Sequence, residues 1–111
     1  AAAAGADGPQ QPTAIYAASD TFAVYLMQAA FQAGVRIPQQ FSIVGFDNID
    51  FSSDTIPPLT TVDQSGMTMG ETAANLLFDM IEQDRGSSEV DDVILEPLLV
   101  VRQSTTARPG R

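Results

Sequence analysis

Two short apolar runs on either side of a helix-like segment constrain the fold of this chain more than any other feature. The first run, TAIYAA, covers residues 13–18, and the second, FSIVGF, covers residues 41–46. Apolar runs of this length are typical of strands buried on both faces of a sheet. The pattern between them predicts a helix over residues 20–33, ended by Gly34. A strand, a helix and a strand in this order predict an α/β fold with a parallel-sheet βαβ unit and a right-handed crossover.

The charge balance and the missing residue types exclude several classes of function. The 111 residues carry fourteen acids against five arginines and no lysine, which gives a net charge of −9. A DNA-binding surface needs a basic face, and anionic membranes repel such a charge. There is no cysteine or histidine, so disulfides, thiolate nucleophiles, imidazole bases and imidazole metal ligands are excluded. We expect no membrane span, cofactor or metal, and one domain over residues 13–111 after a low-complexity leader at 1–12.

Polar side chains follow both apolar runs at the point where each predicted strand ends. Ser19 and Asp20 come after the first run, and Asp47 and Asn48 come after the second. Because ligands bind at the carboxyl ends of parallel strands, we expect these side chains to share one ligand-binding edge. The alternative is that Ser19 only caps a helix and Asp47 only begins a turn.

The acids of this region do not have the spacing of a metal site or the partners of a catalytic one. Asp47, Asp50 and Asp54 do not follow the ligand positions of an EF-hand, and the glycine of that loop is missing. A catalytic role for Asp47 would need an orienting partner and an oxyanion donor, and the sequence suggests neither. We therefore expect no enzyme.

Beyond the acidic loop, the chain alternates short extended segments with one long helix. Residues 60–62 and 98–103 are expected to be extended. Residues 67–83 are expected to form an amphipathic helix, with Thr68 and Glu71 in capping-box spacing. The apolar face of this helix consists of Gly70, Ala73, Ala74, Leu77, Phe78 and Ile81.

The helix predicted over residues 20–33 is apolar on two sides. On a helical wheel the first stripe comprises Phe22, Leu26, Ala29, Ala30 and Ala33, and the opposite stripe comprises Val24, Met27 and Phe31. A helix that covers a sheet needs one apolar stripe, so the second must be covered by another element or by another subunit. In so short a chain few elements are available. We therefore favour a subunit contact, most simply in a symmetric homodimer.

The order of motifs along the chain is similar to that of one protein family. TAIYAASD is followed by AGVRIP, then SIVGFDN, PPLTT and finally LLVVRQSTT. This series, over about residues 12–107, resembles the C-terminal part of LacI/GalR-family transcriptional regulators. The resemblance implies part of a periplasmic-binding-protein-like fold of two lobes, with the DNA-reading helix-turn-helix, the hinge helix and the first half of the effector domain outside this segment.

The resemblance also implies roles for particular residues. Asp47 and Ser19 match positions that face the effector, and Asp20 matches the neighbouring motif position, where it chiefly starts a helix. The effector would be a small polyhydroxylated molecule such as a sugar, since a carboxylate accepts strong hydrogen bonds from hydroxyls. The expected dimer interface comprises Val24, Met27, Gln28, Phe31, Phe51, Thr55 and Ile56. The helix at 67–83 would pack on the other lobe.

Two functions follow from this reading. The favoured one is the effector-binding and dimerisation portion of a cytoplasmic regulator that contacts operator DNA only through its N-terminal part. The alternative is a periplasmic or surface solute-binding protein of a sugar transporter. We also expect the isolated segment to self-associate, exchange its second helix between subunits or fold marginally, because an apolar helix face left in water costs several kcal/mol, at about 25 cal/mol per Å².

Overall fold

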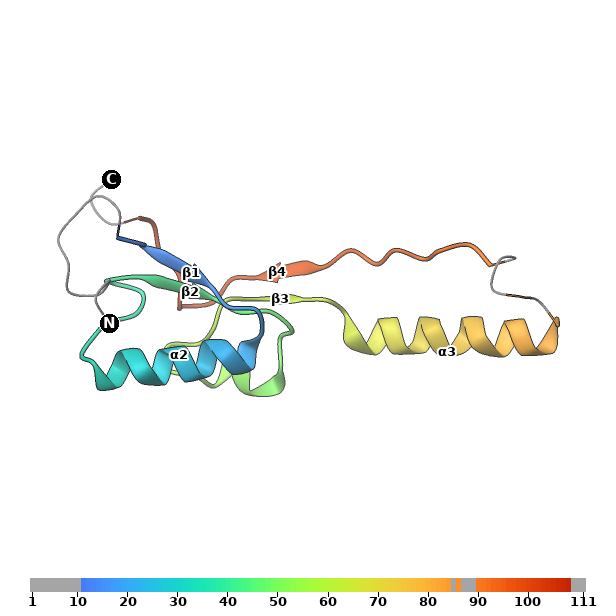
Figure 1. Cartoon of the computed structure of the whole chain (residues 1–111), viewed down its shortest axis with the longest axis horizontal. Coiled ribbons are helices and arrows are strands. Elements are labelled where there is room, and N and C mark those ends of the chain that lie inside the picture. The colour runs from blue at the N-terminus through green and yellow to red at the C-terminus, as the bar shows by residue number, and fades with distance from the viewer. Residues whose placement is uncertain (1–10, 85, 87–89, 109–111) are drawn as a thin grey trace.

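The computed structural model describes residues 11–84, 86 and 90–108, which form an α/β lobe with a long arm (Figure 1). The expected leader at 1–12 lies almost wholly outside the described residues. The molecule measures 63 × 28 × 22 Å, with a Cα radius of gyration of 19.3 Å. A compact domain of this length has a radius of gyration of about 13 Å. The arm therefore projects from the lobe instead of folding back onto it.

The predicted βαβ unit forms the lobe. β1 (Ala14–Tyr16) and β2 (Ser42–Val44) pair in parallel, with Ile15 opposite Ile43. Helix α2 (Asp20–Gln32) connects them and packs on the sheet. The α/β class and the parallel strand pair are thus confirmed.

Glycines allow the turns and close contacts of this unit. Helix α2 ends at Gln32, and Gly34 follows with a positive φ of 74°, which a residue with a side chain adopts only at a cost. Gly45 continues β2 past the start of α2. A Cβ atom at this position would collide with the Asp20 carboxylate and press on Leu59. The backbone of β2 therefore approaches the helix start more closely than any other residue type would permit.

A second two-stranded sheet begins beside β2. After the short 3₁₀ helix η1 (Asp50–Ser53), the chain enters β3 (Thr61–Asp63). A parallel bridge joins Val44 to Thr60, and the Gly45 N–H donates to the Thr60 carbonyl at 2.9 Å. β3 pairs antiparallel with β4 (Leu98–Val100), and these two strands form the base of the arm.

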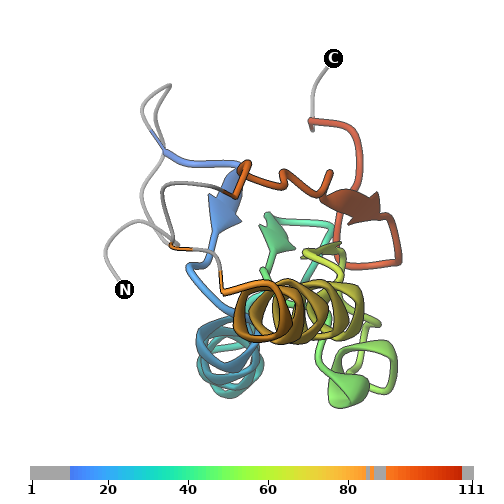
Figure 2. The same ribbon diagram turned by 90° about the vertical axis from the view of Figure 1, so that its right-hand side faces the viewer.

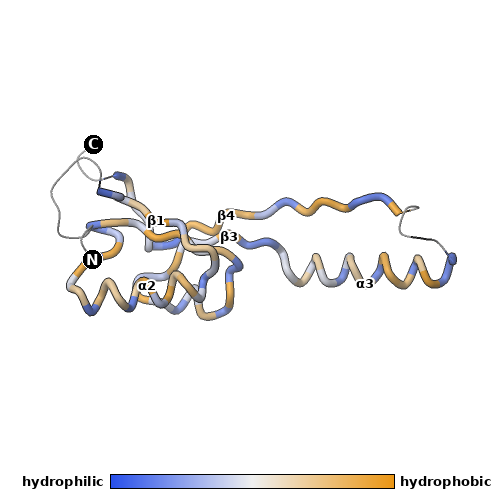
Figure 3. Tube along the Cα trace, in the orientation of Figure 1, coloured by the Kyte–Doolittle hydropathy of each residue, from blue (hydrophilic) through white to orange (hydrophobic). Residues whose placement is uncertain are grey.

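We define the arm as helix α3 (Gly66–Glu82) together with residues 90–97, which return beside it (Figures 1 and 2). No residue of α3 is buried. Apolar residues lie along both legs of the arm (Figure 3). The expected capping box is wrong, because the helix begins at Gly66 after Ser65 and Thr68 lies inside its first turn.

The core lies between α2 and the strands. It comprises Ala17, Ala23, Met27, Ile43 and Leu59, with Leu26, Ile37 and Phe41 packed against it. The division of α2 into two buried stripes is wrong in part: Met27, expected at the dimer interface, is only 7% exposed and lies in the core, whereas Phe22, on the opposite stripe, is 63% exposed. The core face is Ala23, Met27 and Ala30, at three- and four-residue spacing.

Candidate functional site

The carboxyl ends of β1 and β2 meet at one edge of the lobe, as the sequence predicts. The two strands are parallel, and the Asp20 N–H donates to the Phe46 carbonyl at 2.8 Å. This bond joins the residue after Ser19 to the residue before Asp47. The two polar clusters that follow the strands therefore lie side by side.

Asp47 has an unusual backbone conformation at this edge. Its φ is 118°, in the region that favours glycine, and its N–H donates to the Val62 carbonyl at 2.9 Å. A non-glycine residue in this region is strained and persists only where its surroundings hold it. Asp47 is half-buried, and its Oδ1 accepts a 2.6 Å hydrogen bond from Nε2 of Gln64. Its Oδ2 receives no hydrogen bond from the described residues.

Asn48 continues the turn in the left-handed conformation, with φ of 55°. This conformation is tolerable for asparagine, whose side chain bonds to neighbouring groups. Its Nδ2 donates to Oδ2 of Asp63 at 3.2 Å, and its Oδ1 accepts from Nη2 of Arg102 at 2.7 Å and from the Ser52 hydroxyl at 3.2 Å. The turn that presents Asp47 is thus tied to three other segments.

Ser19 lies at the start of α2, and Asp20 lies beneath the edge. The Ser19 hydroxyl oxygen accepts from the Phe22 N–H at 3.3 Å and caps the helix. Ser19 is therefore the N-cap of α2, and its half-buried side chain also lies at the carboxyl edge of the strands.

Asp20 is fully buried, and both of its carboxylate oxygens are used within the chain. Oδ1 accepts from the Thr61 hydroxyl at 2.6 Å, and Oδ2 accepts from the Ile49 N–H at 2.9 Å. This corrects the expectation that Asp20 contacts an effector directly. Its carboxylate instead joins the start of α2 to β3 and to the segment after Asn48, and so supports the edge from below.

Gln64 and Arg102 also belong to this site, and neither they nor the bonding partners of Asn48 were predicted from the sequence. All three contacts join residues at least 15 positions apart, which periodicity does not detect. One indication was available for Arg102. It is one of only five cations in the chain and follows the apolar residues 98–101, where an arginine needs buried acceptors.

Asp63 connects the turn to the start of the arm. Its Oδ1 accepts from the Ser65 N–H at 2.7 Å, and its Oδ2 accepts from Asn48. These two hydrogen bonds, first that of Ser65 and then that of Asn48, lower the pKa of the Asp63 carboxyl below its ordinary value because they stabilise the ionised form.

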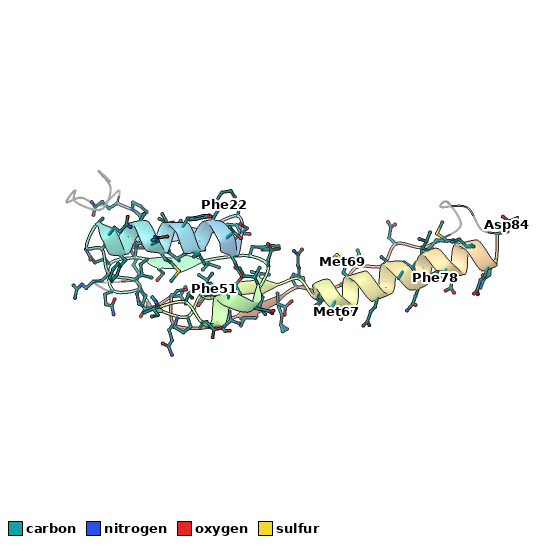
Figure 4. The ribbon with its side chains drawn as sticks, turned by 90° about the horizontal axis from the view of Figure 1, so that it is seen from below. Phe22, Phe51, Met67, Met69, Phe78 and Asp84 are labelled. Carbon is teal, nitrogen blue, oxygen red and sulfur yellow. The ribbon has the colours of Figure 1, made fainter. Side chains whose placement is uncertain are left out.

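A second candidate surface lies on the outside of α2 and η1, which sit on the same side of the sheets (Figures 2 and 4). Large apolar side chains are exposed here: Phe22, Tyr25, Phe31, Phe51 and Ile56. Among the residues expected at an interface, Gln28 is also exposed and Val24 is half-buried. Met27 and Thr55 are instead buried within the chain, where the Thr55 hydroxyl donates to backbone carbonyls, so they offer little area to a partner.

Within the described ranges, no group of three or more acidic, histidine or cysteine residues is arranged to hold a metal ion. The same part of the chain contains no helix long and apolar enough to cross a membrane.

The lobe has a parallel strand pair with a polar carboxyl edge, which is where ligand-binding proteins of the open α/β class hold their ligands. The chain belongs to the periplasmic binding protein-like domain family, whose model matches residues 1–105, and it corresponds to the C-terminal part of LacI/GalR-type regulators. It is 38% identical over 102 residues to the HTH-type transcriptional repressor PurR of Erwinia tasmaniensis, covering 92% of this chain and 29% of that protein.

Solved structures give the same relationship. A LacI family transcriptional regulator from Enterococcus faecium with bound ribose matches 84% of this chain with a TM-score of 0.78 and 35% identity. The lac repressor dimer bound to operator and the anti-inducer ONPF matches 86% with a TM-score of 0.77 and 34% identity. This chain covers 34% and 32% of those chains, so it spans about a third or less of its relatives.

Proposed function

We propose that this chain is the effector-binding and dimerisation portion of a bacterial LacI/GalR-type transcriptional regulator whose effector is a small polyhydroxylated molecule such as a sugar. The observation that carries the proposal is the Asp47 carboxylate, held at the shared edge with one oxygen bonded to Gln64 and the other unpaired among the described residues. A carboxylate in this state can accept hydrogen bonds from neighbouring hydroxyls of a sugar.

Ser19 is the second proposed effector contact, since it caps α2 at the same edge as the Asp47 turn. Asp20 acts from beneath by fixing the helix start and the segment after the turn. The fold of the ribose-bound regulator from Enterococcus faecium supports a sugar-like ligand for this type of lobe.

The proposed homodimer surface is the exposed face of α2 and η1. It includes the expected residues Val24, Gln28, Phe31, Phe51 and Ile56, to which the structure adds Phe22 and Tyr25. Met27 and Thr55 lie beneath this surface. The dimeric form of the lac repressor, which shares this fold, supports the proposal.

The proposed mechanism is linkage between two binding equilibria. An effector bound between two lobes favours one arrangement of the lobes, and the dimer transmits this preference to operator affinity. No covalent bond changes, which agrees with relatives that are repressors and not enzymes. Operator DNA would be contacted by a part of the regulator outside this acidic segment, in the cytoplasm. The same relatives disfavour the alternative of a transporter's solute-binding protein.

The test begins with a thermal-shift screen of the complete regulator against sugars, polyols and nucleosides. Isothermal titration calorimetry with the best ligand then compares Asp47→Asn with Asp54→Asn, an exposed acid in the neighbouring loop. We expect Asp47→Asn to weaken binding about 10- to 100-fold, as for a lost hydrogen bond to a charged group, and Asp54→Asn to leave it unchanged. Equal affinity of the Asp47 variant and the wild type would remove Asp47 from the site.

A further inference from the structure

The Arg102 guanidinium lies at the centre of a hydrogen-bond network that joins three segments. Its Nη1 donates to the Ser52 hydroxyl oxygen and to the Leu59 carbonyl, both at 2.9 Å, and its Nη2 donates to Oδ1 of Asn48 at 2.7 Å. The acceptors belong to η1, to the segment that enters β3 and to the turn after Asp47. A planar guanidinium can hold three such acceptors in fixed geometry, which a lysine ammonium on a flexible stem cannot.

The backbone of the same residue is also anchored. The Arg102 N–H donates to Oγ1 of Thr60 at 2.9 Å. Arg102 follows β4 by two residues, so its position depends on the strand that returns from the arm. β4 in turn pairs with β3, whose last residue, Asp63, holds the start of α3. The guanidinium is therefore attached to the base of the arm, whereas its acceptors lie in the lobe.

Among the three acceptors, Asn48 depends most on its hydrogen bonds, because it belongs to a strained turn. Asp47 and Asn48 have φ values of 118° and 55°, and such a turn needs contacts from outside to persist. The Asn48 side chain is held at one end by Arg102 and at the other by Asp63. Asp63 is the last residue of β3, and Arg102 follows β4 by two residues, so both holding groups are connected to the strands at the base of the arm. A shift of these strands would change the turn that presents the Asp47 carboxylate.

The network also reaches the face proposed for dimerisation. Ser52 is fully buried; its one hydroxyl proton is shared between the Ile49 carbonyl at 2.6 Å and Oδ1 of Asn48 at 3.2 Å, while its oxygen accepts from Arg102. The neighbouring residue, Phe51, is exposed on that face. One guanidinium thus contacts both the turn of the candidate effector site and the support of the candidate interface.

We infer that Arg102 is a positioning residue through which the base of the arm sets the conformation of the Asp47–Asn48 turn and of η1. The part of this inference that concerns effector affinity rests on the proposed function. The part that concerns the conformation of the turn does not require any ligand.

The first experiment measures hydrogen exchange in the complete regulator without ligand, for the wild type, Arg102→Lys and the matched control Arg36→Lys. Arg36 is exposed, and its guanidinium makes no hydrogen bond or ion pair in the part of the chain that is described. We expect Arg102→Lys to speed exchange of the amides at 48–59 about tenfold or more, with the core strands and the control unchanged. Unchanged exchange in this segment would overturn the inference.

A second variant tests the route through the turn and covers the case in which Arg102→Lys does not fold. Asn48→Gly keeps a residue that accepts a positive φ but removes the side chain that Arg102 and Asp63 hold. We expect the same faster exchange at residues 48–59. We also expect the double variant to be less impaired than the sum of the two single variants, because the Arg102–Asn48 hydrogen bond is lost in both. Additive effects would show that Arg102 does not act through Asn48.

The third measurement is effector affinity, determined well below the melting temperature of each variant. We expect the Kd to rise about tenfold in both single variants while the circular dichroism spectrum stays native. A residue that only stabilises the fold would lower the melting temperature and leave the Kd unchanged. If the wild-type regulator binds no sugar-like ligand, the proposed function fails, and the exchange data still decide the role of Arg102.

Discussion

Nε2 of Gln64 donates a 2.6 Å hydrogen bond to Oδ1 of Asp47, across 17 positions of sequence. Asp47 lies in the turn after β2, in the lobe. Gln64 directly follows β3, at the point where the chain enters the arm. The carboxylate proposed to meet the effector is therefore oriented by a side chain at the base of the arm. Any movement of the arm relative to the lobe acts directly on this contact.

Gln64→Glu tests this relationship. The substitution replaces the donor with a second carboxylate beside Asp47, which removes the hydrogen bond and adds repulsion between like charges. We expect effector affinity to fall about tenfold or more at pH 7 and to recover in part as the pH falls and one of the two carboxyls is protonated. Calorimetric titrations at several pH values measure this. Gln39→Glu, on an exposed turn, is the control and should bind as the wild type does; equal affinities for both variants at every pH would contradict the prediction.

The outer face of α2 and η1 gives a prediction about oligomeric state. Phe31 is 83% exposed, so Phe31→Asp should leave the lobe folded but dissociate the proposed homodimer of the complete regulator. Sedimentation velocity measures the dissociation, with Gln39→Asp as a control of equal charge change. Met27 lies on the same helix but in the core. Met27→Ala should therefore lower the free energy of unfolding by about 2–5 kcal/mol and keep the dimer. A dimer that survives Phe31→Asp would place the interface elsewhere.

The arm predicts how the 111-residue segment behaves when it is isolated. No residue of α3 is buried, and Ile94 on the returning leg is 89% exposed. The two legs line a groove of about 190 Å³. Apolar area of this extent in water costs several kcal/mol, at about 25 cal/mol per Å². We expect the segment to self-associate, exchange arms or melt without cooperativity. Light scattering and calorimetry measure this, and a monomer with one sharp transition would contradict it.

The low pKa of Asp63 predicts a contribution to acid stability. Because the folded pKa lies below the unfolded value, the ionised group stabilises the fold above the unfolded pKa, and this stabilisation is lost as the pH falls through the folded pKa. The pH range in which this stabilisation is lost therefore begins near the ordinary pKa of 3.8 and extends below it. Asn48→Gly should raise the Asp63 pKa only in part, because the Ser65 hydrogen bond, the larger cause, remains. Carbon-13 NMR titration of the carboxyl measures the shift, and an unchanged pKa would show that Asn48 contributes nothing.

The sequence predicted the local elements and the edge at which the candidate site lies. Apolar runs of strand length, the helix between them and the polar residues that follow each run are short-range properties, so the parallel pair and the neighbouring positions of Ser19 and Asp47 could be derived from them. It also predicted a helix close to the bounds of α3, because a period of 3.6 residues is visible without any partner. Family membership followed from the order of the motifs.

Only the tertiary structure decided which side chains support the site and which face of α2 is the core. A helical wheel shows two apolar stripes but not which residues meet the sheet, so Met27 was expected at the dimer interface although it lies in the core. Likewise, the sequence does not distinguish a buried structural aspartate such as Asp20 from an aspartate that binds a ligand. The hydrogen-bond partners of Asp20, Thr61 and Ile49, lie 41 and 29 positions away. Such contacts depend on how strands pair across the fold, and that pairing fixes the Asp47 turn through Gln64 and Arg102.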